Sequence, residues 1–227
     1  LLISWQKQIY KMHKLDHIVF GSRTLEEGTV FVENILQAKL SDIGYHKDMG
    51  THNRVIRISD EVYFEVIAND PKIKNLKNRK WFNLDNSNLQ LKLKKSPQII
   101  GYVIENNRLG ISKYYDQFFE ASRGEYRWHF AMPTLKKNIL DIGIIETGII
   151  PSLISWKSEK PIYQMKKNQF ELISFEIQIS EKQQYLNTFF KSFGEIEYVS
   201  VSMTKEEETS IFKLKLKDNL RDIVISL

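Results

Sequence analysis

The sequence predicts an α+β fold made of repeated units, each with the order strand, helix, strand, strand, strand. Short β-branched and aromatic runs surround an amphipathic helical stretch in the first 70 residues, and a similar pattern restarts at Gln98 and again at Phe170. The chain has 227 residues, of which 42% are hydrophobic, so it can bury a substantial core. We expect one domain of paired units or two small domains.

The first strand is expected over residues 15–20, LDHIVF. Alternation along this strand places His17 on the same face as Leu15. Asp16 is expected on the opposite face. The run TLEE, which begins at Thr24, is a capping box and predicts that a helix starts there.

Three strands are expected after this helix, and Pro71 ends the first unit. The strands cover residues 40–46, 51–59 and 62–68, with a turn at residues 48–50. The segment 72–97 that follows is rich in lysine and asparagine and contains Trp81. We interpret it as an irregular insertion with one aromatic anchor.

The second unit is expected to contain a strand, a helix and two further strands. The strands cover residues 98–106, 124–133 and 149–156, with an insertion at residues 134–148. The helix is predicted from apolar and aromatic residues at spacings of three and four, namely Ile111, Tyr114, Tyr115, Phe118 and Phe119.

The third unit begins with a strand over residues 170–179. A second capping box at Ser180 and Gln183 predicts a helix, and Gly194 is placed as its C-terminal cap. Three strands then complete the unit, over residues 197–203, 210–217 and 222–227, with an acidic hairpin turn at residues 206–208.

Composition excludes several classes of protein. The absence of cysteine excludes disulfides, thiolate zinc sites and cysteine nucleophiles, so any metal needs nitrogen and oxygen ligands. The net charge of +5 comes mainly from dispersed lysines, which favours a solvated surface and no nucleic-acid partner. No apolar stretch is long enough for a signal peptide or a membrane span, so we expect a cytoplasmic protein. Residues 1–14 are interpreted as an N-terminal extension.

Several segments resemble the vicinal oxygen chelate superfamily, and in particular its glyoxalase-like domain. These segments are LDHIVF, GYHKDMGTHN, YFEVIA, EYRWHFAMP and IIPSLISW, of which GTHN with the following YFEVIA is the most specific. The resemblance covers residues 15–156, with paired units at 15–70 and 98–156 and an insertion at 71–97. Residues 157–227 are similar to a further, diverged unit.

The resemblance implies a fold and a site. In that superfamily the curved mixed sheets of two units enclose a cleft, with helices outside. A first-strand ligand and a last-strand carboxylate hold a divalent ion, which binds two adjacent oxygens of the substrate. His17 matches the first-strand ligand and Glu65 the carboxylate, which implies a divalent ion such as Mn, Ni, Zn, Fe or Mg.

The second unit departs from this pattern. Gly101 stands where a second histidine would be, and Ile154 or Ser155 stands where a second carboxylate would be. Half of the usual ligand set is therefore missing, unless His52 or His129 replaces it.

Further residues are candidates for the cleft. His52 is expected to orient the substrate or transfer a proton, because an imidazole beside the amide of Asn53 supplies donors and acceptors. Arg127 is our choice among the arginines able to bind a carboxylate or phosphate, ahead of Arg54, Arg57 and Arg123. Residues expected to bind substrate are His46, Asn53, Arg127 and Trp128.

Two functions follow from these observations. The first is a metal-dependent lyase, isomerase or dioxygenase that acts on a small oxygenated molecule, with His52 and Glu65 as catalytic residues. The second is a metal-free protein that binds or sequesters such a molecule, as resistance proteins of the superfamily do. A non-catalytic partner domain is a third reading if Trp128 and Trp156 fill the cleft. Related units often pair between chains, so a homodimer is a further expectation.

Overall fold

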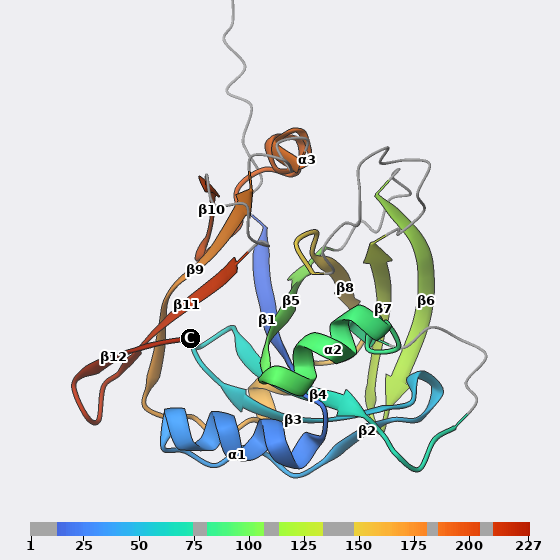
Figure 1. Ribbon diagram of the computed structural model, residues 1–227, viewed down its shortest axis with the longest axis horizontal. Helices are drawn as coiled ribbons and strands as arrows, with labels where there is room; N and C mark the ends of the chain where they lie inside the picture. Colours follow the sequence, from blue (N-terminus) through green and yellow to red (C-terminus); the bar gives the residue numbers. More distant parts are fainter. Residues whose placement is uncertain (1–12, 75–80, 107–113, 134–147, 181–185, 205–210) are drawn as a thin grey trace, which may run out of the picture.

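The computed structural model describes residues 13–74, 81–106, 114–133, 148–180, 186–204 and 211–227. Their strands form one sheet of eight and one of four (Figure 1). The large sheet contains β1 (Lys14–Gly21), β2 (Gly44–His46), β3 (Thr51–Arg57), β4 (Tyr63–Asn69), β5 (Gln98–Glu105), β6 (Tyr115–Arg123), β7 (Tyr126–Pro133) and β8 (Ser152–Trp156). The small sheet contains β9 (Phe170–Ser180), β10 (Val199–Thr204), β11 (Ile211–Asp218) and β12 (Ile223–Ser226). The α-helices are α1 (Leu25–Leu36), α2 (Ser87–Lys95) and α3 (Leu186–Phe193).

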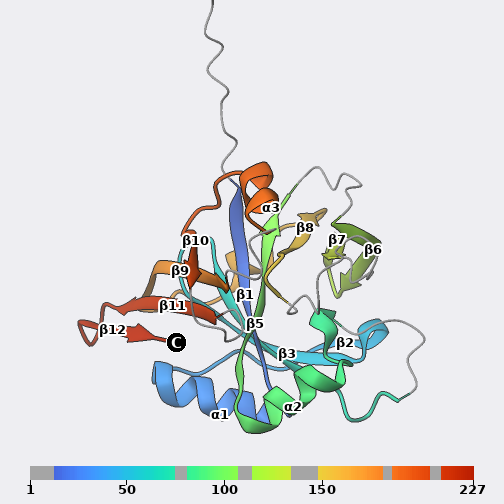
Figure 2. The same ribbon diagram turned by 45° about the horizontal axis from the view of Figure 1, so that its top comes forward.

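The large sheet consists of two halves with the same strand pairing. Its order is β2-β3-β4-β1-β5-β8-β7-β6. In each half the first strand pairs in parallel with the last, β1 with β4 and β5 with β8, and the other pairs are antiparallel. The halves join where β1 and β5 run antiparallel at the centre (Figure 2). This arrangement confirms the α+β class and the repeated unit.

Helix α1 packs on the outer face of the large sheet. Its N-terminus is capped as predicted, because the Thr24 hydroxyl accepts a hydrogen bond from the amide of Glu27 at 3.2 Å. Val32 and Leu36 are fully buried in the same cluster as Ile18. The helix therefore fixes the outside of the strand that carries His17.

The small sheet covers the same outer face near β1 and β5. Phe175 on β9 contacts Tyr102 on β5, with ring centroids 5.4 Å apart. The first strand of the small sheet, β9, pairs in parallel with β10 and antiparallel with β11. In each half of the large sheet, by contrast, the first strand pairs in parallel with the last strand of that half. Helix α3 is followed by Gly194 at a φ of 96°, which confirms the predicted cap. Gln183 and the predicted turn at residues 206–208 lie outside the described residues.

The predicted helix with Phe118 and Phe119 is wrong where the structure describes it. Residues 115–123 form strand β6, which pairs with β7 in a register that joins Phe119 to Phe130. Phe119 packs against Trp81 and Phe130 on the inner face, whereas Phe118 is exposed. Adjacent aromatic residues are compatible with the period of a helix and with that of a strand, so their spacing does not distinguish the two. Pairing with β7 makes this segment a strand.

Two other predictions need correction. The insertion 72–97 contains helix α2, which begins at the cap Asn86, whose side chain accepts from the amides of Asn88 and Leu89. Its buried residues Leu89 and Leu93 are four apart. Trp81 is the buried aromatic anchor that was predicted. The expected strand over residues 40–46 is limited to β2, and the insertion at 134–147 lies outside the described residues.

The inner, concave face of the large sheet carries a second apolar cluster. It receives residues from both halves, among them Val19, Ile67, Phe130 and Ile154. The cluster does not fill the whole face, and the remaining space forms the cavity described below. None of the helices that the structure describes is long and apolar enough to cross a membrane.

Candidate functional site

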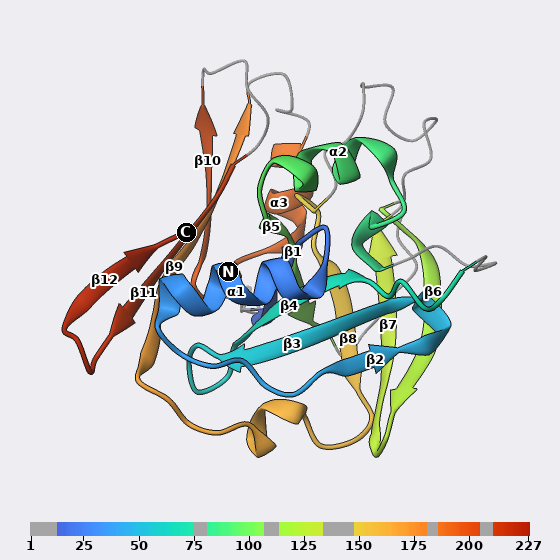
Figure 3. The ribbon, with the colours of Figure 1, turned by 60° about the horizontal axis from the view of Figure 1, so that its bottom comes forward.

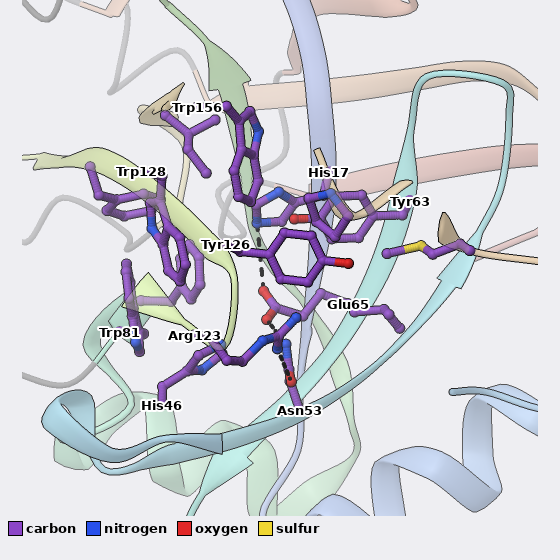
Figure 4. Close-up of a pocket in the computed structure, with 16 residues that line it drawn as sticks. His17, His46, Asn53, Tyr63, Glu65, Trp81, Arg123, Tyr126, Trp128 and Trp156 are labelled. Carbon is purple, nitrogen blue, oxygen red and sulfur yellow. Dashed lines mark hydrogen bonds and ion pairs between the residues drawn. The ribbon is translucent and has the colours of Figure 1, made fainter. Parts of the chain in front are cut away.

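A cavity with a free volume of about 40 Å³ opens on the inner face of the large sheet (Figure 4). This volume admits several water molecules or a small ligand group. Both halves of the sheet contribute side chains to it. The lining residues are His17, His46, Asn53, Val55, Tyr63, Glu65, Trp81, Phe82, Arg123, Tyr126, Trp128, Phe130, Ile154, Trp156, Pro161 and Met165.

A β-bulge in β1 determines how this strand contributes to the site. The register against β5 shifts between Leu15 and His17, so the strict alternation predicted for this strand is wrong at this point. Leu15 packs in the outer cluster with Ile18, whereas Asp16 lies beside His17 and bonds to it. The bulge therefore brings two consecutive polar side chains to the same region.

His17 is held on both sides of its buried ring. Its Nδ1 lies 2.6 Å from Asp16 Oδ1, and its Nε2 lies 3.6 Å from Glu65 Oε2. Tyr63 stacks on the imidazole, with centroids 4.6 Å apart and planes at 19°. Because Nδ1 is engaged with the Asp16 carboxylate, Nε2 is the ring nitrogen that faces Glu65.

Glu65 connects this group to the second half of the sheet. Its Oε1 accepts a hydrogen bond from Asn53 Nδ2 at 2.5 Å, and Asn53 Oδ1 accepts one from Arg123 Nη1 at 3.1 Å. Glu65 and Asn53 are buried, and Arg123 reaches them from the end of β6 (Figure 4). A chain of polar contacts therefore runs from β6 through β3 and β4 to β1.

The second half also holds Asp16. Trp156 Nε1 on β8 donates to Asp16 Oδ2 at 2.8 Å. Trp128 packs against Trp156, with centroids 5.5 Å apart, and Phe130 completes this apolar side of the cavity. The first half of the sheet thus supplies the polar side chains, and the second supplies aromatic walls plus two donors that hold them.

Tyr63 and His46 are neutral in this setting. Burial raises the pKa of Tyr63 well above its usual value, and the nearby charges of Asp16 and Glu65 raise it further. Burial lowers the pKa of His46 to about 3, with smaller contributions from Arg123 and two other histidines. His46 Nδ1 lies 3.1 Å from Thr51 Oγ1, so the ring is fixed at the cavity edge.

The structure brings most of the predicted site residues together. His17, Glu65, His46, Asn53 and Trp128 all line the cavity. The side chains of Trp128 and Trp156 leave this space open rather than filling it, which counts against the reading as a non-catalytic partner domain.

The predictions for His52 and Arg127 are not supported by position. His52 alternates with Asn53 along β3, does not line the cavity and faces Tyr45 on the other side of the strand. Burial lowers its pKa, and its Nε2 has no hydrogen-bond partner among the described residues. Arg127 alternates with Trp128 on β7 and is exposed. Strand parity places both residues on the wrong face.

Sequence reasoning missed several residues of the cavity. Arg123 lines the cavity in place of the expected Arg127, and no sequence pattern predicted the contacts of Asp16 and Tyr63 with His17. The relevant signal for Arg123 is parity, because residues 119, 121 and 123 share the inner face once β6 is a strand. The bulge in β1 is the reason why simple alternation predicted the wrong face for Asp16.

The connection from β8 to β9 closes one side of the cavity. Figure 3 shows it running below the large sheet, with a 3₁₀ turn at Pro161–Gln164. Pro161 and Met165 line the cavity, and Gln164 Oε1 accepts a hydrogen bond from the Tyr126 hydroxyl at 2.5 Å. Lys160 Nζ donates to Glu105 Oε2 at 2.5 Å. These contacts tie the connection to both β5 and β7.

The site fits a divalent ion only in part. Ligand bonds of about 2.1 Å allow two ligand atoms to lie no more than about 4.2 Å apart, and the 3.6 Å between His17 Nε2 and Glu65 Oε2 meets this limit. In the second half, Val103 is the residue that pairs with His17, in place of the expected Gly101, and Ile154 lies on the same inner face, so neither position provides a ligand. Among the described residues no group of three or more potential ligands occurs.

Comparison with known proteins identifies one matching family. The family model for the glyoxalase-like domain matches residues 15–189. No curated protein matches the chain. Similar solved structures include a Streptomyces coelicolor methylmalonyl-CoA epimerase variant in complex with 2-nitronate-propionyl-CoA, at 12% identity and a TM-score of 0.42, covering 65% of this chain and 100% of that one.

Two more structures are similar at the same level. A hypothetical protein from Bacillus halodurans has 14% identity and a TM-score of 0.41, covering 70% of this chain and 100% of that one. A 4-hydroxymandelate synthase mutant from Streptomyces coelicolor has 10% identity and a TM-score of 0.40, and the match covers 66% of this chain and 50% of that one. Because the family model covers well over half of the sequence, the chain belongs to the glyoxalase-like domain family.

Proposed function

We propose that this protein binds a small oxygen-bearing molecule in the cavity between the two halves of the large sheet. The observation that carries this proposal is the convergence of His17 Nε2 and Glu65 Oε2, 3.6 Å apart, in a cavity whose other side is aromatic. Buried polar side chains that converge beside free space are typical of ligand sites. The ligand's oxygens would face the polar side of the cavity, which is lined by His17, Glu65 and Arg123, and its apolar part would face Trp128.

A fragment screen by ligand-observed NMR tests this proposal. Small alcohols, ketones, acids and amides are mixed with the wild-type protein and with Val55→Trp, a variant whose larger side chain fills the cavity that Val55 lines. We expect a subset to bind the wild type and to lose binding in the variant. If no fragment binds the wild type more tightly than Val55→Trp, the proposed function is wrong.

His17 could also act on the bound molecule. Asp16 holds Nδ1 as a donor, so Nε2 can accept a proton from a ligand atom placed between it and Glu65. Neutral His46, with its pKa of about 3, adds no positive charge beside this position. The polar side of the cavity thus supports proton transfer without a further group.

A divalent ion is a second candidate, favoured by the spacing of His17 and Glu65. These two residues would hold it, and a bound ion would polarise a carbonyl or stabilise an enolate of the ligand. The family resemblance suggests Mn, Ni, Zn, Fe or Mg, and lyase, isomerase or dioxygenase chemistry. Metal-free binding or sequestration is the alternative, and the apolar residues of the second half, Val103 and Ile154, favour it.

Metal analysis separates these alternatives. The protein is purified without chelator, its metal content is measured, and thermal shifts are recorded with each of the five metals. The variants His17→Ala and Glu65→Gln test the two proposed metal-binding residues. The controls are His129→Ala and Glu120→Gln, which change a more exposed pair whose side chains lie 3.8 Å apart. An ion at 100 times its Kd stabilises by about 2.7 kcal/mol. Stabilisation lost only in the first two variants supports the metal, and no stabilisation supports metal-free binding.

A further inference from the structure

Arg123 is the only lysine or arginine among the residues that line the described cavity. Its guanidinium carries five N–H donors, and among the described residues it forms one hydrogen bond, from Nη1 to Asn53 Oδ1. No described carboxylate forms an ion pair with it, whereas Asp16 and Glu65 both receive hydrogen bonds from neighbouring side chains. Arg123 therefore has further donors available at the cavity, whereas Glu65 Oε1 and both oxygens of Asp16 already have polar partners.

The position of Arg123 depends on the lack of a side chain at residue 44. A Cβ added at Gly44 would collide with Arg123 Nη1 and with Asn53 Oδ1. Gly44 lies on β2 opposite Asn53, so the edge of the first half leaves room for an arginine from the second. The two halves of the sheet thus meet at a built contact that presents the guanidinium to the cavity.

We infer that the ligand is a small monocarboxylate with a flat or branched apolar body, whose carboxylate pairs with Arg123. This inference rests on the proposed function, because it uses the same cavity. A planar carboxylate matches the guanidinium fork. The apolar body lies against Trp128 and Phe130, which face the polar side.

The charges already present limit the ligand to one negative charge. Glu65 lines the same space and Asp16 lies next to it beside His17, so both carboxylates would repel a dianion such as a phosphate monoester. The free volume of about 40 Å³ also favours a small head group. A carboxylate next to Arg123 is separated from Glu65 by the amide of Asn53, which accepts a hydrogen bond from Arg123 and donates one to Glu65.

The test compares three probes of the same body: phenylacetate, phenylacetamide and benzylphosphonate. Dissociation constants are measured by NMR titration for the wild type, Arg123→Met, Gly44→Ala and Arg127→Met. Arg127 is a matched control, because it is an exposed arginine on the opposite face of the neighbouring strand. Gly44→Ala keeps the charge of Arg123 but displaces it, and thermal melting verifies that each variant is folded.

The wild type is expected to bind phenylacetate about ten- to a hundredfold more tightly than phenylacetamide, which is typical of a hydrogen bond to a charged group. Arg123→Met and Gly44→Ala abolish this preference, and Arg127→Met keeps it. Equal binding of the acid and the amide by the wild type, or a preference that survives Arg123→Met, overturns the inference while the cavity proposal stands. Tighter binding of benzylphosphonate overturns the restriction to monoanions. If no probe binds and the fragment screen also fails, both proposals are wrong.

Discussion

Trp156 Nε1 lies 2.8 Å from Asp16 Oδ2, so a side chain of the second half holds the carboxylate that in turn holds His17. The bond crosses between strands that do not pair with each other, because β5 lies between β1 and β8. The second half of the sheet therefore contributes to the polar site through this indole as well as through Arg123.

Trp156→Phe is predicted to destabilise the protein by about 1–3 kcal/mol, because it leaves one oxygen of buried Asp16 without its donor. Urea denaturation measures the change. Trp81→Phe is the control, since Trp81 also lines this cavity but its Nε1 has no partner among the described residues. Equal losses in the two variants would show that ring size, and not the hydrogen bond, is what matters.

His46 makes stability depend on pH. Its pKa is about 3 in the folded state against an ordinary value of 6.5, so the unfolded chain binds more protons between these values. Stability from this residue is complete above pH 6.5 and falls with decreasing pH, at up to about 1.4 kcal/mol per pH unit.

Guanidinium denaturation of the wild type and His46→Gln at pH 7 and pH 5 measures this contribution. The loss between the two pH values should be smaller in the variant, because it lacks the buried imidazole. An identical loss would mean that His46 accepts a proton in the fold without cost.

The tie between Tyr126 and Gln164 is predicted to hold the β8–β9 connection against the cavity. Tyr126→Phe removes this hydrogen bond, which is worth about 1 kcal/mol, so amide exchange at residues 161–165 should quicken roughly fivefold. Mass spectrometry of deuterium uptake measures it. Tyr163→Phe, an exposed residue of the same turn, should leave the rate unchanged.

The cap of α2 is predicted to stabilise the fold. Asn86→Ala leaves the amides of Asn88 and Leu89 without their acceptor and should cost about 1 kcal/mol of unfolding free energy. Asn88→Ala, exposed in the first turn, should change it by much less. Comparable losses of unfolding free energy in the two variants would show that helix propensity, and not the cap, is responsible.

Sequence patterns predicted the repeated unit, most strand positions and the meeting of His17 with Glu65, because hydrophobic periodicity and the family resemblance both report on them. They failed where one residue changes the parity of a strand. The bulge before His17 brought Asp16 inward, and the strand at Phe118–Phe119 turned Arg123 toward the cavity. Neither change alters composition or spacing, so no local pattern reveals it.

His52 and Arg127 illustrate the same limit. Each lies one position from a cavity residue, Asn53 and Trp128, and a shift of one residue along a strand reverses the direction of the side chain. Neighbouring polar residues in a strand are therefore poor guides to a site until pairing is known.

The packing of Phe175 against Tyr102 has a practical consequence for dissecting the molecule. A minimal fragment that ends after β8 would retain all but two of the cavity's lining residues, yet it would expose the ring of Tyr102, which is 1% exposed in the whole chain. A shortened protein of this kind would expose an apolar surface that favours aggregation, so the C-terminal strands should be kept when the protein is expressed.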